Sequence, residues 1–459
     1  MYLLSRHEKK NRVMDNPDLQ RYRKYLIAGI VIISVILIVI NFEWISTYKS
    51  ALSVASLRGN ILASSTDFVN VTIAHGSDAY YALSEVRESL VADIRVIVDE
   101  LRVALVESGS NGQTQVSRGI VVFLPVNIAK FEKELKALFL SVAVMRTYQP
   151  AHVKTDLIVG TPRAGFPYPE SLGCTRTLRT NFDDPERCIV VEHVPLLERP
   201  WTDNPLKEYA NYIDSMLVLS EFSNPQGYMV LMRTDLDTFV TPGFGKWTLP
   251  SDKVLVTGHG GYGSENSEHH LSWIIKSQLG LVNAELKNVG STWVGNSKVM
   301  VATAKLTVAS MVWLHTQEFS IYEKKHSGTD GWPHWHWPVL LLYGGHIAVN
   351  QIPLSRVFVT NLDTELRLDY GTTTTTLMTD SILHIHCWHT DDLFSKFRFS
   401  LGQYKELDLE PFLALNSSQS YATSVAVSSD RIPNQEFALI VNDSQKMKDK
   451  DWIRQKYIV

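Results

Sequence analysis

Two aspartates separated by a single residue follow a short apolar segment near the middle of the chain. Residues 228–232 are hydrophobic, and Asp235 and Asp237 come shortly after them. Five consecutive hydrophobic residues are typical of a strand buried inside a sheet. Ligands of open α/β sheets bind at the carboxyl ends of such strands, and carboxylate oxygens suit Mg²⁺ or Mn²⁺. The pattern therefore predicts a divalent-metal site for a phosphorylated substrate, although the same spacing also occurs by chance in surface turns.

Histidines gather in a late segment of the chain. His384, His386 and His389 lie within six residues, and a strand over 381–387 would place the first two on one face. His389 would then lie beyond the end of that strand. Imidazole nitrogens are common metal ligands, but each of these histidines is equally well explained as a core residue bonded to the backbone.

A glycine-rich loop follows the aspartates by about twenty residues. It spans residues 258–263, and Gly260 and Gly261 at its centre would let the backbone approach a sugar or a phosphate closely. A hairpin or the entry turn of a helix explains the same residues. The loop lacks the Lys-Ser/Thr ending of a P-loop.

Alternating strands and helices must position these groups. The pattern predicts a doubly wound, mainly parallel sheet of the α/β class. We assign residues 118–440 to this domain and residues 441–459 to a polar C-terminal tail. Within the domain, the predicted strands before the aspartates are 119–126, 155–160 and 188–194, and the predicted helices are 127–146 and 205–222.

An apolar run near the amino terminus is long enough to cross a bilayer. Residues 25–42 are almost uninterrupted Ile, Val and Leu, and the run continues to Ile45. Basic residues outnumber acidic ones in the preceding segment 1–24, which keeps that segment in the cytosol. We therefore predict a single transmembrane helix at 25–45 and type II topology. A cleaved signal peptide would have a shorter apolar region and a small-residue cleavage site.

The predicted lumenal stem covers residues 46–117 and contains an amphipathic helix at 80–107. Apolar residues recur there at intervals of three, four or seven: Leu83, Leu90, Ile94, Ile97 and Leu101. Such a helix either packs on its own domain or joins two stems in a homodimer, and the pattern favours neither.

Charge and cysteine usage narrow the class of protein further. A net charge of −4 gives no electrostatic reason to expect a nucleic-acid partner. Cys174 and Cys188 flank a polar loop of 13 residues, which predicts a disulfide in an oxidising compartment. Cys387 would then be unpaired.

The membrane anchor, the stem and the Asp235-X-Asp237 motif at a strand end together resemble a GT-A glycosyltransferase of the Golgi. The resemblance covers residues 118–405 and implies Mn²⁺ or Mg²⁺ carrying a nucleotide-sugar diphosphate. Asp237 would bind the metal directly, with Asp235 on the metal or the ribose. The block of residues 233–242 also resembles an uncharacterised eukaryotic family of predicted secretory membrane proteins.

The resemblance also assigns roles to the late segment. Several GT-A enzymes complete the metal site with a late histidine beside a lysine that meets the diphosphate. His389 is the first choice here, His386 the second, and Lys396 matches the lysine. The same segment is similar to the His-X-His-X-Asp-His motif of zinc hydrolases, but Trp388 replaces its aspartate.

A transferase of this kind needs a carboxylate as base, nucleophile or stabiliser, and Glu318 and Asp330 are the candidates. The implied activity is transfer of a sugar from a nucleotide-sugar donor to a glycan, glycoprotein or glycolipid in the Golgi or ER. A catalytically silent GT-A-like scaffold and a histidine-cluster metal hydrolase are the alternatives.

Overall fold

A computed structural model describes most of the chain after residue 77. The described ranges are 78–108, 115–199, 210–223, 225–319, 335–361, 364–371, 377–387 and 394–442. The predicted transmembrane helix at 25–45, His389 and Asp330 lie outside these ranges. The chain divides into compact units at 1–61 and 62–459, and all the described residues belong to the second unit.

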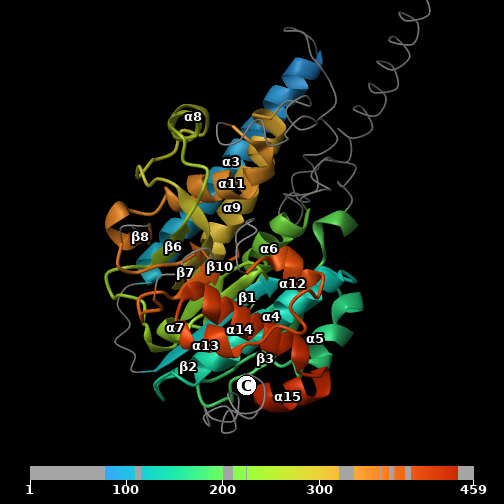
Figure 1. The fold of residues 1–459 in the computed structure, drawn as a ribbon. Coiled ribbons are helices and arrows are strands. Elements are labelled where there is room, and N and C mark those ends of the chain that lie inside the picture. The colour runs from blue at the N-terminus through green and yellow to red at the C-terminus, as the bar shows by residue number, and fades with distance from the viewer. Residues whose placement is uncertain are drawn as a thin grey trace, which may run out of the picture. The chain divides into compact units, whose positions relative to one another are not determined.

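A seven-stranded sheet forms the centre of this unit (Figure 1). Its strands, in spatial order, are β3 (Cys188–Glu192), β2 (Val153–Thr161), β1 (Val116–Phe123), β4 (Val230–Arg233), β7 (Val289–Asn296), β6 (Leu255–His259) and β8 (Val357–Val359). Only β7 runs antiparallel to its neighbours among these seven described strands. The predicted α/β class and mainly parallel sheet are confirmed.

Helices pack on both faces of the sheet because side chains alternate along each strand. In β1, Val121 and Phe123 belong to the core beneath α3 (Asp78–Glu107), α6 (Ala210–Ser220), α9 (Ser297–Gln317) and α11 (Leu340–Val349). Ile120 and Val122 belong to the opposite core, beneath α4 (Ala129–Arg146) and α14 (Ser418–Arg431).

Shorter elements complete the unit. The α-helices are α5 (Pro167–Ser171), α7 (Pro242–Lys246), α8 (Glu265–Trp273), α12 (Lys396–Ser400), α13 (Glu410–Ala414) and α15 (Asn434–Asn442), and a π-helical turn spans Ile274–Gln278. The 3₁₀ turns are Arg163–Gly165, Leu196–Glu198, Pro225–Gly227, Trp337–Val339 and Leu354–Arg356.

The amphipathic helix predicted at 80–107 is present as α3, and it packs on its own domain. Its apolar residues Leu90, Ile94 and Leu101 are buried against a core that includes α9. Two ion pairs, Lys298–Glu107 and Lys305–Glu100, also join α9 to α3. A homodimer through the stem stays a prediction.

A second, three-stranded sheet brings the late histidines to the aspartates. Its central strand β10 (His384–His386) pairs antiparallel with β5 (Thr238–Val240) and parallel with β9 (Tyr370–Gly371). The partner of His386 in this register is Thr238, the residue after Asp237. Residues almost 150 positions apart in the chain therefore become direct neighbours.

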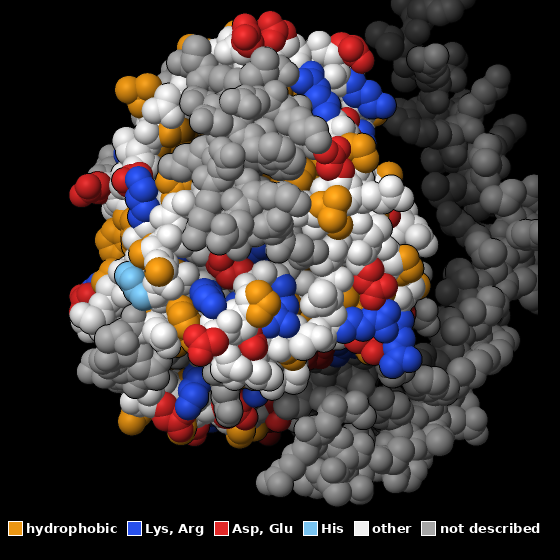
Figure 2. Space-filling model, turned by 90° about the horizontal axis from the view of Figure 1, so that it is seen from below, with side chains coloured by type: hydrophobic (Ala, Val, Ile, Leu, Met, Phe, Trp, Pro, Cys, Tyr) orange, Lys and Arg blue, Asp and Glu red, His pale blue; other side chains and the backbone are white. Residues whose placement is uncertain are grey.

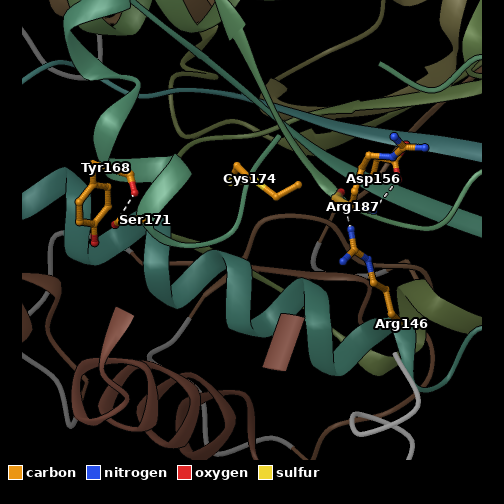
Figure 3. Close-up of a disulfide and its surroundings, with 7 residues drawn as sticks. Arg146, Asp156, Tyr168, Ser171, Cys174 and Arg187 are labelled. Carbon is orange, nitrogen blue, oxygen red and sulfur yellow. Dashed lines mark hydrogen bonds between the residues drawn. A yellow bond between two sulfur atoms is a disulfide. The ribbon is translucent and has the colours of Figure 1, made fainter. Parts of the chain in front are cut away.

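The predicted disulfide is present between Cys174 and Cys188 (Figure 3). It ties the start of β3 to the preceding loop. The neighbouring backbone is held as well, because Asp156 accepts a hydrogen bond from the Arg187 amide and Arg146 donates one to the Arg187 carbonyl. Cys387 is free and buried.

Within the described residues, one helix has the length and composition to cross a membrane. It is α9, but 83% of its apolar window is buried inside the domain, as in the core helix of a globular fold. The surface shows no single sign of charge on the face drawn in Figure 2, where acidic and basic side chains are interspersed.

Candidate functional site

A cavity of about 810 Å³ lies where β1 and β4 end. Phe123 and Pro125 line it after β1, and residues 233–237 line it after β4. The carboxyl ends of parallel strands are the usual binding edge of an open α/β sheet, so the cavity occupies the expected place. Further lining comes from α4, the loop after β6, the start of α11 and β9, and from His386, Cys387 and Lys396.

Three side chains in this cavity form a group with the composition of a metal site. One ligand atom from each of Asp235, Asp237 and His386 lies within 4.8 Å of the other two. Mg²⁺ and Mn²⁺ bind carboxylate oxygens at about 2.0–2.2 Å, and Mn²⁺, the softer of the two, also accepts imidazole nitrogen, so ligands on opposite sides of one ion stand roughly 4 Å apart. Two carboxylates and one imidazole at this spacing fit a single divalent cation.

Asp237 is enclosed by positive groups on two sides. Lys396 Nζ lies 2.5 Å from its Oδ2, and His386 Nε2 lies 3.6 Å from its Oδ1. Burial raises the pKa of Asp237, but His386 and Lys396 outweigh that effect and hold the pKa well below its ordinary range. The carboxylate is therefore ionised and ready to act as a ligand.

His386 is held between two carboxylates. Its Nδ1 lies 3.4 Å from Asp369 Oδ1, on the side opposite Asp237. Burial lowers the pKa of His386, but Asp237 and Asp369 overcome this effect and raise it to about 10. The imidazole must lose that proton before Nε2 can bind a metal, because metal ligands are deprotonated.

Asp369 was not among the residues that the sequence singled out. It is buried, and it accepts hydrogen bonds from the Thr292 hydroxyl at 2.5 Å and the Thr292 amide at 3.1 Å. Its backbone is in the left-handed region, with φ of 53°. A carboxylate behind a metal-binding histidine fixes the ring orientation and the tautomer, and this is the position that Asp369 occupies.

His384 also faces the Asp369 carboxylate, but its ring lies in the core. It is fully buried, its Nε2 lies 2.8 Å from the Thr234 hydroxyl, and its Nδ1 lies 3.4 Å from Asp369 Oδ1. His384 therefore supports the site from behind, whereas His386 faces the cavity.

Asp235 is oriented by Arg233 at the end of β4. Nη2 of this buried arginine donates a hydrogen bond to Asp235 Oδ1 at 2.7 Å, and Nη1 donates one to the Ser291 carbonyl at the same distance. The Thr238 hydroxyl also donates to the Asp235 carbonyl. Both aspartates thus have fixed backbone and side-chain geometry.

The other predicted site residues divide into two groups. Gly260, Gly261 and Lys396 line the cavity together with the metal-site residues. Glu318 is not among the lining residues, and it lies 3.1 Å from His270 Nε2 in a pair at the end of α9. The catalytic role predicted for Glu318 has no support from this position.

The fold and the cavity define a mainly parallel α/β protein with a carboxylate–imidazole cluster at the carboxyl edge of its sheet. The chain belongs to the family described as domain of unknown function DUF7164, whose model matches residues 112–455. A search of curated proteins found no match.

Two solved structures are similar to parts of the chain. One is described as the apo structure of the WbbM bifunctional glycosyltransferase, with a TM-score of 0.31 and 12% identity over 57% of this chain and 41% of that one. The other is mouse xyloside xylosyltransferase 1, also in the apo form, with a TM-score of 0.27 and 10% identity over 57% of this chain and 87% of that one. The chain therefore spans less than half of the WbbM structure, and TM-scores below 0.5 carry no argument about activity.

Proposed function

We propose that this chain is a divalent-metal-dependent glycosyltransferase that uses a nucleotide-sugar donor. The observation that supports it most directly is the meeting of Asp235, Asp237 and His386 beside Lys396 at the binding edge of the sheet. A divalent cation beside a buried ammonium group suits a diphosphate, which carries negative charge on several oxygens.

In this proposal each residue has a defined task. Asp235, Asp237 and His386 would hold Mn²⁺ or Mg²⁺, which when bound supplies positive charge for the departing diphosphate. Lys396 lies against Asp237 and would also neutralise charge on the leaving group. The ring of His386 keeps its orientation because Asp369 accepts from Nδ1.

The predicted transmembrane helix at 25–45 extends the proposal to a place in the cell. It would anchor the domain on the lumenal side of the Golgi or ER membrane, with type II topology. A glycan, glycoprotein or glycolipid acceptor follows from that location. The disulfide between Cys174 and Cys188 supports an oxidising compartment.

The histidine-cluster hydrolase has less support. A zinc hydrolase of that type needs several histidines on its metal, whereas His384 is buried with Nε2 bonded to Thr234. His386 is the histidine of the described late segment that faces the cavity.

Ligand binding by the full chain in detergent tests the proposal. We expect UDP or GDP to bind in the presence of Mn²⁺, and a panel of nucleotide sugars to include at least one that is hydrolysed or transferred. Asp237→Asn should weaken Mn²⁺-dependent nucleotide binding at least tenfold, because one charged ligand is lost. Asp252→Asn is the matched control, since Asp252 is exposed and pairs with Lys253. Absence of both Mn²⁺-dependent nucleotide binding and turnover in the wild-type chain would contradict the proposal.

A further inference from the structure

One acidic side chain of the cavity wall belongs neither to the metal group nor to the pair of Asp369 and His386. It is Glu134, on the face of α4 that lines the cavity beside Lys130 and Phe131. The Glu134 side chain is only 4% exposed. Glu134 occupies an i+3 position relative to Phe131, on the apolar side of a helix that otherwise carries Leu135, Leu138 and Phe139 into the core.

One oxygen of the buried Glu134 carboxyl group lacks a hydrogen bond. Its Oε1 has no hydrogen-bond partner among the described residues, and the nearest cation, Lys130 Nζ, is 3.7 Å away. An unsatisfied buried acceptor destabilises the fold, so such groups are retained where a ligand or a water molecule satisfies them. A carboxyl group in this condition on a cavity wall indicates a ligand contact.

The charges around Glu134 indicate which part of a ligand it meets. Burial and the charge of Asp237 raise its pKa to about 8, against the opposing effects of Lys130 and Lys396. With a pKa near 8 the Glu134 carboxyl group is mostly neutral at pH 7, so a cation would be drawn to the ionised Asp237 in preference to Glu134, and a phosphate group to Lys396. A neutral hydroxyl group fits best, because it can both donate a hydrogen bond to a carboxyl group and accept one from it.

We propose that Glu134 contacts the substrate and hydrogen-bonds a hydroxyl group of the sugar that the donor carries. This inference rests on the proposed function, because the sugar of a nucleotide sugar is attached directly to the diphosphate that the metal site and Lys396 would hold. Glu134 lies close enough to both Asp237 and Lys396 for their charges to act on it. Glu134 would then contribute to selection of the donor sugar and would make no contact with the nucleotide part of the donor.

Comparison of nucleotide binding with nucleotide-sugar binding distinguishes a contact with the sugar from a contact with the nucleotide. Full-length wild-type protein, Glu134→Ala and Glu134→Gln are titrated with Mn²⁺ plus UDP, GDP, UDP-glucose, UDP-galactose, UDP-N-acetylglucosamine or GDP-mannose, with no acceptor present. We expect Glu134→Ala to weaken binding of the preferred nucleotide sugar about 10- to 100-fold, the loss of one buried hydrogen bond, and to leave binding of the free nucleotide within about twofold. Glu134→Gln keeps a neutral donor and acceptor and should retain most of the sugar-dependent affinity.

Controls keep the outcomes distinct. Glu132→Gln changes a carboxyl group on the same helix that does not line the cavity, and it should behave as wild type. Thermal melting shows whether each variant folds. Glu134→Met, which keeps the length of the side chain but has no carboxyl oxygens, carries the test if Glu134→Ala does not fold, with the same loss of sugar-dependent affinity expected.

Two results would overturn the inference while leaving the proposed function intact. One is unchanged preference for the nucleotide sugar over the nucleotide in Glu134→Ala, or in Glu134→Met where Glu134→Ala does not fold. The other is a loss of turnover with an acceptor without any loss of donor binding, which would place Glu134 on the acceptor. If the wild-type chain binds neither nucleotides nor nucleotide sugars with Mn²⁺, the proposed function fails and the inference fails with it.

Discussion

The carboxylate of Asp369 holds the imidazole of His386, with Oδ1 at 3.4 Å from Nδ1. This contact leaves Nε2 directed toward Asp237, whose Oδ1 lies 3.6 Å away. The arrangement is a carboxylate–histidine pair placed behind the proposed metal site. It explains why a residue with no ligand role of its own is buried, bonded twice to Thr292 and kept in a left-handed backbone conformation.

Replacing Asp369 by Asn should weaken metal binding without removing a ligand. Loss of the carboxylate leaves the ring of His386 less well oriented and less basic, and such changes typically cost 10- to 100-fold in metal affinity. Titration calorimetry of the full chain with Mn²⁺ measures the change. Asp380→Asn is the control, because the Asp380 side chain is 68% exposed. Equal Mn²⁺ affinity in Asp369→Asn and wild type would show that Asp369 does not orient the ligand.

Gly258 should tolerate no side chain, because Asp369 occupies the space beside it. A methyl group there would lie 1.9 Å from Asp369 Oδ2 and 2.6 Å from its Cγ. We expect Gly258→Ala to lower the unfolding free energy by about 1–3 kcal/mol, as overpacking does, and to weaken Mn²⁺ binding by displacing Asp369. Gly261→Ala adds the same methyl group at an exposed position of the same loop. Equal melting temperatures for the two variants would contradict the prediction.

Bound Mn²⁺ should restore part of the stability that is lost when Lys396 is replaced. The Lys396 side chain is 6% exposed and lies 2.5 Å from Asp237, so Lys396→Met leaves a partly buried carboxylate with one cationic neighbour fewer. Removing one partner of a buried pair typically costs about 3–5 kcal/mol. We expect a lower melting temperature for Lys396→Met and a larger increase on adding Mn²⁺ than wild type shows.

The control for that comparison is Lys246→Met. Lys246 pairs with Asp380 at the surface, where such pairs contribute about 0–1 kcal/mol. Its melting temperature and its response to Mn²⁺ should match those of wild type. An increase with Mn²⁺ that is no larger in Lys396→Met than in wild type would mean that the ion and the ammonium group do not share Asp237.

Local sequence signals predicted the parts of the site that follow regular elements. The apolar run before Asp235 identified β4, and the position of Asp237 at a strand end followed from the alternation of strands and helices. Lys396 came from the resemblance, and it lines the cavity. The predicted end of the first strand was wrong by three residues. β1 ends at Phe123 because Pro125 has no N–H for a ladder, and Asn127 turns the chain with φ of 58°.

Long-range pairing explains what the sequence could not predict. Asp369 precedes a strand of two residues, β9, which has no periodicity of its own. It reaches His386 only because β10 pairs with both β9 and β5. Glu134 carried a weak signal, an acidic residue on the apolar side of a helix. Such a residue indicates either a buried ion pair or a site, and only the cavity distinguishes them.

His346 should make the domain sensitive to acid. It is buried, its Nδ1 accepts from the Tyr262 hydroxyl at 3.1 Å, and burial lowers its pKa from 6.5 to about 4. The unfolded chain takes up a proton at this histidine below about pH 6.5, whereas the folded chain does so only near pH 4. The stability that neutral His346 contributes to the fold is therefore complete above pH 6.5. It is lost as the pH falls toward 4, which lowers the unfolding free energy by about 3 kcal/mol at most.

We expect His346→Asn, which keeps an acceptor near the Nδ1 position, to show a smaller decrease in unfolding free energy between pH 7 and pH 4.5 than wild type. Urea unfolding of the full chain at a series of pH values measures it, with the exposed His152 changed to Asn as the control. The same decrease in His346→Asn and in wild type would exclude His346 as the source of the acid sensitivity.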